Sequence, residues 1–350
     1  MAALLKCFFL VALLGATYNY VECNDTCKET WKDVTNAIKE GSKESFVNHV
    51  GPLAQMAKTA YTANTGEEIP GWQLVQEFKM INGLYALAYK SETDSNKLVL
   101  AFRGIRFGDN DSGGTEDDLC ARFYLMDAGL ECSDDKRGLP ESCKRIPGWV
   151  LDYLNQARIF IAQLRATYPD ECFLYTGHSL GATLSSILSA TSRGFESHAV
   201  SFAPSPSNVP QIVTNLGIDA DYSRVITLFD EYDGNVDLDK CKYGIRCRFE
   251  GPEPEACATC TADKPFPDIS EVLADMQSPC ELCLHHTHFF SHILKTINDE
   301  GTQRPQCYEQ DCVAIPFAKE DQKEDTVERR LLDLLSERFT GPDDDGAKGR

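Results

Sequence analysis

The sequence predicts an α/β domain with a mostly parallel sheet and helices on both faces. Short apolar segments typical of buried strands alternate with segments whose apolar residues recur at helical spacing. At one strand-to-helix transition stands the pentapeptide 177–181, Gly-His-Ser-Leu-Gly, a G-x-S-x-G pattern typical of a sharp turn that presents its serine above a sheet. A cysteine-rich segment at 238–284 interrupts the alternation and is expected to be an insertion.

The N-terminal half is expected to contain a helical region followed by a hairpin. Apolar residues recur at helical spacing over 26–60, which predicts a packing face. Strands are expected at 83–90 and 97–102, because both are apolar and polar turn residues separate them. Residues 106–146 are rich in Gly, Asp and Ser and are expected to be irregular.

The second half alternates helices with buried strands. Apolar residues recur at helical spacing over 148–168, and the apolar segment 171–176 predicts the strand that leads into the pentapeptide. Small and apolar residues at 182–190 predict the helix that follows it. Further strands are expected at 198–203 and 224–229, so the strand–turn–helix context of the motif is complete.

Both ends of the chain are expected to lie outside the folded domain. Residues 1–16 are apolar but too short to span a bilayer, which is typical of a secretory signal with cleavage between 16 and 23. The domain is expected to cover 24–317 with its core at 45–295, and the charged tail 318–350 to be partly disordered. We therefore expect a secreted, extracellular protein with no transmembrane segment.

The charge balance excludes some partners. The formal net charge is −20, whereas nucleic-acid binding needs clustered Lys and Arg to neutralise phosphates. The same charge argues against electrostatic docking onto anionic membranes, although apolar docking at a lipid surface stays open. The sequence does not predict the oligomeric state.

Cysteine usage agrees with export. The chain has 15 cysteines, and loss of Cys7 with the signal leaves fourteen, an even number that predicts disulfides in an oxidising compartment. Asn24 and Asn110 begin glycosylation sequons, which occur in the same compartment. Two C-x-x-C motifs also have a spacing that fits a four-thiolate zinc site, formed by Cys257, Cys260, Cys280 and Cys283. Because exported thiols usually pair, disulfides are favoured and no metal is expected, but the connectivity stays open.

A serine in such a turn needs a histidine to accept its proton and an acid to orient that histidine. The expected chain order is serine, acid, histidine. Asp233 follows the strand 224–229 and is the preferred acid, with Asp230 as the alternative. The base is expected among the histidines that follow the acid, which are His285, His286, His288 and His292.

Backbone donors are expected to complete the site. The N–H of Leu180 follows the serine, and a second N–H is expected from Ile105 at the end of the strand 97–102. Gly177 and Gly181 are expected for steric reasons, because a side chain would crowd the strand against the helix. His178 is expected to pack the turn rather than to act as the base.

Five segments in the right order resemble the class 3, fungal-type lipases of the α/β-hydrolase superfamily. The resemblance covers roughly 45–295 and implies the α/β-hydrolase fold. The segments are 98–104 (LVLAFRG), 146–149 (IPGW), 177–181 (GHSLG), 202–208 (FAPSPSN) and 233–236 (DGNV). The resemblance implies hydrolysis of acylglycerols or related esters at a lipid–water interface, without a cofactor, and a lid within 106–130. A carboxylesterase, a feruloyl-type esterase or a phospholipase on the same fold is the alternative.

Three departures from the family pattern matter for activity. Ile105 stands where the family has Thr or Ser, so no side-chain donor supports the oxyanion there, which can cost on the order of 100-fold in rate. Ala182 replaces a further glycine of the turn. The histidine pattern fits both His286 and His288, and His286 is preferred. A catalytically weak, lipase-like binding protein is therefore a further alternative.

Overall fold

The structure is a computed structural model of the chain. It describes residues 26–62, 67–80, 83–105, 114–127, 141–192, 197–205, 209–233, 243–250, 255–258, 283, 287–288, 290–299 and 303–309. The expected signal segment 1–16, both sequon asparagines (Asn24 and Asn110) and the charged tail 318–350 lie outside these residues. They remain predictions.

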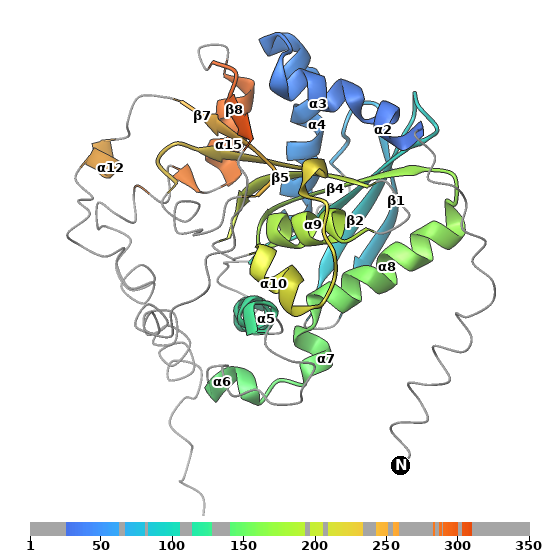
Figure 1. Ribbon diagram of the computed structural model, residues 1–350, viewed down its shortest axis with the longest axis vertical. Coiled ribbons are helices and arrows are strands. Elements are labelled where there is room, and N and C mark those ends of the chain that lie inside the picture. Colours follow the sequence, from blue (N-terminus) through green and yellow to red (C-terminus); the bar gives the residue numbers. More distant parts are fainter. Residues whose placement is uncertain are drawn as a thin grey trace, which may run out of the picture.

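One eight-stranded sheet organises the domain (Figure 1). The strands follow one another in chain order: β1 (Trp72–Lys79), β2 (Tyr85–Ser91), β3 (Lys97–Phe102), β4 (Cys172–Ser179), β5 (His198–Pro204), β6 (Val225–Asp230), β7 (Ile245–Phe249) and β8 (Gln306–Glu309). Strands β3 to β7 pair in parallel, whereas β1, β2 and β8 pair antiparallel at the two edges. The expected mostly parallel α/β sheet is therefore confirmed.

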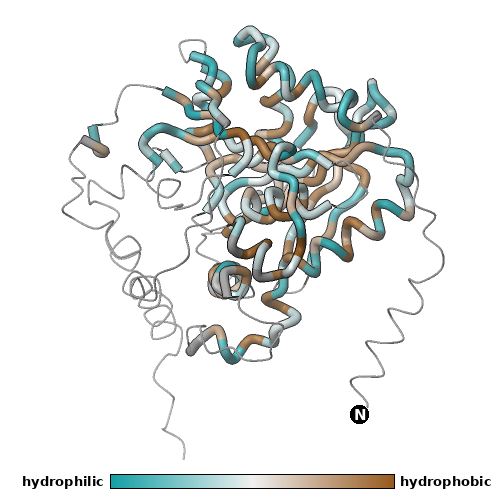
Figure 2. The backbone as a smooth tube through the Cα atoms, in the orientation of Figure 1, coloured by the Kyte–Doolittle hydropathy of each residue, from teal (hydrophilic) through white to brown (hydrophobic). Residues whose placement is uncertain are grey.

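Helices cover both faces of the sheet. One buried cluster joins the sheet to α3 (Lys32–Lys39), α4 (Lys43–Thr62) and α15 (Phe290–Asn298). The other joins it to α5 (Gly114–Asp127), α8 (Tyr153–Thr167), α9 (Leu180–Ala190) and α10 (Val209–Asn215). The remaining short helices are α2 (Thr26–Thr30), α6 (Glu141–Lys144), α7 (Gly148–Leu151), η1 (Tyr222–Arg224) and α12 (Glu255–Ala258). Apolar residues concentrate along the central strands and on the helix faces turned toward them (Figure 2).

Disulfides link segments that are distant in the sequence. Those among the described residues are Cys27–Cys172, Cys120–Cys143, Cys247–Cys307 and Cys257–Cys283. The second of these joins α5 to α6, and the third joins the paired strands β7 and β8. The expectation of disulfides is confirmed, and such crosslinks are typical of proteins exposed to an oxidising compartment.

The structure differs from the predicted elements in several places. The helical region 26–60 is divided into three helices, and the break between α3 and α4 falls at Gly41, where a Cβ would lie 2.7 Å from the Ala37 backbone. Strand β1 was not predicted: it is an edge strand with a bulge between Leu74 and Gln76, which disturbs its alternation. Strand β7 falls within the predicted insertion, and Arg246 conceals its apolar pattern. Helix α5 lies in the stretch expected to be irregular.

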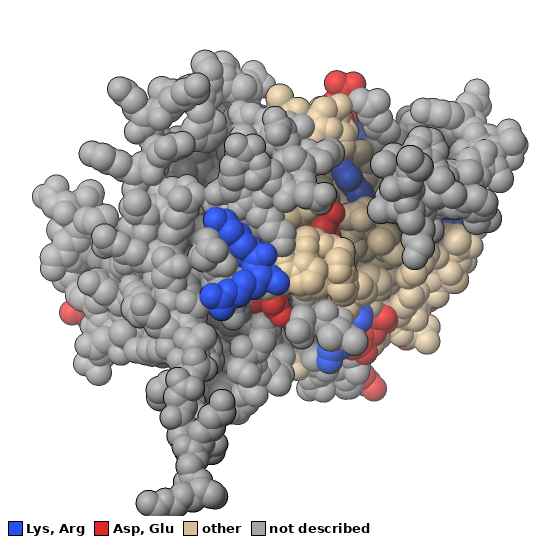
Figure 3. All heavy atoms as spheres, turned by 90° about the horizontal axis from the view of Figure 1, so that it is seen from below, with Lys and Arg blue, Asp and Glu red and all other residues tan. Residues whose placement is uncertain are grey.

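The surface carries charged and uncharged regions side by side. Figure 3 shows a face on which uncharged residues of the described chain form a patch, with Lys or Arg and Asp or Glu side chains beside it. Trp149 of α7 is the most exposed large apolar side chain of the described residues, at 65%. No helix in the described part of the chain is both long enough and apolar enough to cross a membrane.

Candidate active site

Ser179 stands at the turn between strand β4 and helix α9. Its backbone has φ 55° and ψ −122°, a region that residues with a side chain rarely adopt. A Cβ on Gly177 would lie 2.6 Å from the Gly181 backbone, and a Cβ on Gly181 would overlap the carbonyl oxygen of Phe102. The two glycines therefore allow α9 to approach β3 and β4 closely, as the sequence motif predicts.

The turn brings Ser179 next to a histidine and a buried carboxylate. Nε2 of His288 lies 3.3 Å from Oγ of Ser179, and Nδ1 of His288 lies 2.9 Å from Oδ2 of Asp233. Asp233 follows β6, and its side chain has no exposed surface, whereas that of His288 is 15% exposed. This is the order nucleophile, base and orienting acid that acyl transfer to a serine requires.

The alternatives for acid and base lie elsewhere or outside the described residues. His286 is not among the described residues, so His288 is the predicted histidine that the structure brings to Ser179. Asp230, the alternative acid, accepts from Nε2 of His292 in α15 at 3.0 Å. The Asp230 carboxylate therefore makes a second contact between the end of β6 and the segment that contains His288 and His292.

His178 contributes more than packing to the turn. Its ring is buried, with Nδ1 2.8 Å from the Tyr61 hydroxyl and Nε2 2.7 Å from the backbone carbonyl of His288. Burial and the nearby His288 ring hold the pKa of His178 well below its usual value, so the ring is neutral. Sequence reasoning missed Tyr61, because helical periodicity identifies it only as a residue of α4.

The segment after β3 approaches the serine turn closely. A Cβ at Gly104 would overlap the Tyr61 hydroxyl and lie 2.5 Å from the His178 carbonyl. Ile105 follows, 7% exposed, and packs in the same buried cluster as Leu180. Leu180 is the first residue of α9, where helix N–H groups lack an intrahelical acceptor. Leu180 thus follows Ser179 directly, and Ile105 follows the glycine that approaches the turn; their roles as oxyanion donors stay predictions.

Helix α5 lies within the segment that the family resemblance implies to be a lid. Its Asp118 is 1% exposed and accepts from Arg103 at 3.1 Å and from the Tyr153 hydroxyl at 2.6 Å. The Cys120–Cys143 disulfide ties the same helix to α6. These contacts hold the inner face of α5 against the core, and the lid within 106–130 stays a prediction.

The four-thiolate zinc alternative is wrong. Cys257 and Cys283 form a disulfide, so each C-x-x-C motif loses one potential thiolate. Within the described residues, no group of three or more His, Cys, Asp or Glu side chains is arranged to hold a metal ion.

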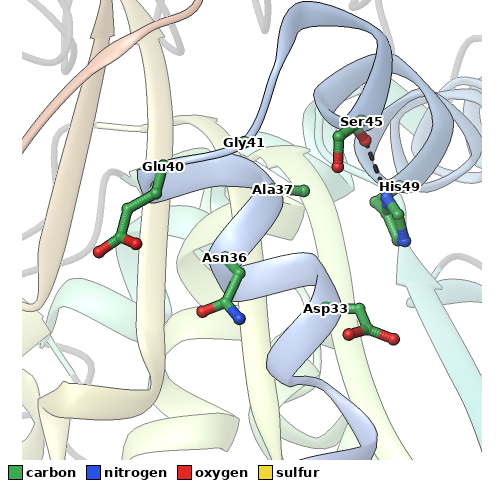
Figure 4. Close-up of a pocket in the computed structure, with 7 residues that line it drawn as sticks. All are labelled: Asp33, Asn36, Ala37, Glu40, Gly41, Ser45 and His49. Carbon is green, nitrogen blue, oxygen red and sulfur yellow. Dashed lines mark hydrogen bonds between the residues drawn. The ribbon is translucent and has the colours of Figure 1, made fainter.

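A separate pocket of about 300 Å³ lies between α3 and the start of α4 (Figure 4). It is lined by Asp33, Asn36, Ala37, Glu40, Gly41, Ser45 and His49. Nδ1 of His49 donates to the Ser45 carbonyl at 2.8 Å, so this ring is tied to its own helix. None of the predicted site residues lines this pocket.

The chain is similar in sequence to a curated protein and in structure to several solved lipases. No protein-family model matches the chain. A stretch of 166 residues is 31% identical to a curated protein named "Putative lipase ATG15" from Eremothecium gossypii, and it covers 40% of this chain and 30% of that protein. The chain therefore spans about a third of the length of the curated relative that it matches.

Solved lipases superpose on part of the domain. Lip2 lipase from Yarrowia lipolytica aligns over 60% of this chain and 80% of its own, with 16% identity and a TM-score of 0.37. The mono- and diacylglycerol lipase from Aspergillus oryzae aligns over 71% and 98%, with 17% identity and a TM-score of 0.38.

The strand order and the turn at Ser179 define an α/β-hydrolase. The parallel strands β3 to β7, antiparallel strands at the edges and a strained serine between β4 and α9 are the features of that fold. The partial sequence match to the putative lipase ATG15 includes 40% of this chain.

Proposed function

We propose that this chain is a secreted serine hydrolase that cleaves carboxylic ester bonds of acylglycerols. The observation that carries the proposal is the alignment of Ser179, His288 and the buried Asp233 at 3.3 and 2.9 Å. The longer contact exceeds the usual hydrogen-bond reach of about 2.6–3.2 Å only slightly, and such contacts tighten when substrate binds.

In the proposed mechanism Ser179 attacks the ester carbonyl while His288 accepts its proton at Nε2. The N–H at Nδ1 of His288 donates to Asp233, which stabilises the imidazolium that forms. The N–H groups of Leu180 and Ile105 hold the oxyanion. His288 then protonates the departing alkoxide, which leaves an acyl-serine, and water cleaves the acyl-serine with His288 as general base.

Two further observations support the lipid ester as substrate and the exported location. Trp149 is 65% exposed, and indole side chains favour the interface between lipid and water. The disulfides fit an oxidising compartment, in agreement with the predicted signal segment. The N-glycosylation expected at Asn24 and Asn110 belongs to the same proposal.

The proposal is tested by active-site labelling of the purified, disulfide-intact protein with a fluorophosphonate. We expect labelling of the wild type and none of Ser179→Ala. The matched control is Ser185→Ala, which removes a buried hydroxyl that donates to the Gly181 carbonyl at 2.8 Å within α9 and which should still label. Absence of labelling in folded wild-type protein would favour a lipase-like binding protein instead.

Substrate class is read from turnover of p-nitrophenyl esters of increasing chain length, in solution and as emulsions. Faster turnover of long-chain emulsified esters supports the lipase. Turnover of short, soluble esters alone would favour a carboxylesterase, and release of fatty acid from phospholipid vesicles alone would favour a phospholipase.

A further inference from the structure

A chain of hydrogen bonds connects Tyr61 of α4 to the backbone of His288. The Tyr61 hydroxyl lies against the end of β3, where a Cβ on Gly104 would overlap it, and burial raises the pKa of this hydroxyl. The same hydroxyl lies 2.8 Å from Nδ1 of His178, and Nε2 of His178 lies 2.7 Å from the carbonyl oxygen of His288. Residues from four separate segments thus meet in one line beside Ser179.

The direction of each hydrogen bond follows from the chemistry of its partners. A backbone carbonyl only accepts, so Nε2 of His178 carries the proton that it donates to His288. A neutral imidazole has one N–H, which leaves Nδ1 of His178 as an acceptor for the Tyr61 O–H. The donors therefore point the same way, from Tyr61 through His178 to His288, and hydrogen bonds in such a series strengthen one another. The His178 carbonyl oxygen, 3.2 Å away, is a second acceptor for the same Tyr61 O–H.

The neutral state of His178 is part of this arrangement. Burial and the adjacent His288 ring lower the pKa of His178, and the two ring centroids are 5.0 Å apart. A protonated His178 would lose its acceptor site for Tyr61 and would place a positive charge next to the proposed base. Phe290 packs edge-on against His178 with centroids 5.1 Å apart, which keeps water from the ring.

This chain of hydrogen bonds holds the backbone of His288, which the contacts of its ring do not fix. Ser179 and Asp233 bind the two ring nitrogens, whereas His178 holds the main chain at the carbonyl. Side chain and backbone are then both anchored. Because a misplacement of about 1 Å at a reacting group can cost on the order of 100-fold in rate, this anchor affects catalysis directly.

We propose that His178 and Tyr61 are positioning residues that fix the His288 backbone relative to Ser179 and connect it to the proposed oxyanion segment at Gly104. This inference rests on the proposed hydrolase function. Neither residue touches the reacting atoms in the proposed mechanism, so their contribution belongs in the chemical step and not in substrate affinity.

The test compares variants that keep or remove the hydrogen bonds in the full-length, disulfide-intact protein. His178→Leu removes both bonds of the ring, and Tyr61→Phe removes the hydroxyl alone. His178→Gln retains a donor and an acceptor on one side chain. Tyr89→Phe is the matched control: it removes the hydroxyl of a buried tyrosine in β2, a strand that contributes no residue to the site.

The readouts are kcat and KM on a soluble short-chain ester and the rate of fluorophosphonate labelling. We expect His178→Leu to lower kcat roughly 100-fold and Tyr61→Phe roughly tenfold, both with KM nearly unchanged. His178→Gln should recover at least about tenfold over His178→Leu. Tyr89→Phe should keep the wild-type kcat.

Different results would overturn the positioning role and the proposed hydrolase function. Wild-type protein that shows no Ser179-dependent labelling would overturn the function itself. Labelled wild-type protein together with wild-type kcat in His178→Leu and Tyr61→Phe would overturn only the positioning role. A higher KM at unchanged kcat, or an equal loss in Tyr89→Phe, would overturn it as well.

A spectroscopic measurement covers the case in which His178→Leu does not fold. Nitrogen-15 chemical shifts of the histidine rings in wild-type protein report which nitrogen carries the proton. We expect the Nε2–H tautomer for His178 and the Nδ1–H tautomer for His288. An Nδ1–H tautomer at His178 would reverse the line of donors and overturn the inference.

Discussion

Nδ1 of His288 lies 2.9 Å from Oδ2 of Asp233, a carboxylate with no exposed side-chain surface. Three residues earlier, Asp230 accepts from Nε2 of His292 at 3.0 Å. Two histidine–carboxylate pairs therefore join the end of β6 to α15 and to the residues just before it. A buried carboxylate is destabilising without a partner. We therefore expect the loss of the Asp233–His288 pair to have a larger effect than the loss of the Asp230–His292 pair.

Replacement of Asp233 by Asn should remove most of the proposed activity. The amide cannot stabilise the imidazolium of His288 and favours the wrong tautomer, which in serine hydrolases costs on the order of 10⁴-fold in kcat. The measurement is kcat on a soluble ester, with circular dichroism to verify that the variant is folded.

Asp230→Asn is the matched control for this substitution. It changes the neighbouring pair with His292 and leaves the Ser179–His288 contact in place, so kcat should fall by less than about tenfold. The assignment of Asp233 as the acid would be wrong if Asp230→Asn caused the larger loss.

A side chain at Gly181 should disturb the candidate site and the stability together. The Cβ of Gly181→Ala would overlap the Phe102 carbonyl oxygen and lie 3.0 Å from the carbonyl carbon of Arg103. Because backbone on both sides must move, we expect a loss of about 1–3 kcal/mol in the free energy of unfolding and roughly 100-fold in kcat. Urea unfolding and ester turnover measure the two effects.

Gly51→Ala is the corresponding control in helix α4. A Cβ there meets no atom within 4 Å, so the substitution should raise the free energy of unfolding by about 0.5–1 kcal/mol without a change in kcat. If Gly181→Ala and Gly51→Ala changed the free energy of unfolding and kcat by the same amounts, the steric explanation of the turn would be contradicted.

The central part of the fold was predictable because its sequence signals are local. Strands β3 to β6 are short apolar segments, and the G-x-S-x-G turn marks the point where β4 gives way to α9. The edges were less predictable. Strand β1 is only half-buried, and the charged Arg246 and Arg248 stand in β7, so neither strand has an uninterrupted apolar pattern.

The candidate site shows the same division between local and tertiary signals. Ser179 follows from its motif, and Asp233 follows from its position after a strand. The choice between His286 and His288 does not follow, because both fit the spacing and only the contact with Ser179 distinguishes a candidate base. Tyr61 has no local signal, since its role depends on the approach of α4 to the serine turn.

Cysteine chemistry gives a prediction about metal removal. Because Cys257 and Cys283 are bonded across 26 residues, a chelator should leave the melting temperature and fluorophosphonate labelling unchanged. A disulfide that closes a loop of this length contributes about 3 kcal/mol, so a reducing agent should lower the melting temperature. Mass spectrometry of unreduced peptides should recover the linked pair, and a stoichiometric zinc content would contradict it.

His198 predicts how the free energy of unfolding depends on pH. Burial, with a smaller contribution from nearby Arg224, lowers the pKa of His198 to about 4, from about 6.5 in the unfolded chain. The unfolded state therefore binds a proton more readily, so the contribution of His198 to stability is complete above about pH 6.5 and is lost as the pH falls toward 4. At 1.36 kcal/mol per pKa unit, this loss is at most about 3 kcal/mol.

His198→Gln isolates this contribution, because other titrating groups act equally on both proteins. Urea unfolding at several pH values between 7.5 and 4 should show the wild type losing up to about 3 kcal/mol more than the variant. The difference should develop below pH 6.5 and not above it. Parallel curves for the two proteins would mean that His198 is protonated as readily in the folded chain as in the unfolded one, in contradiction to the lowered pKa that its partial burial at the start of β5 causes.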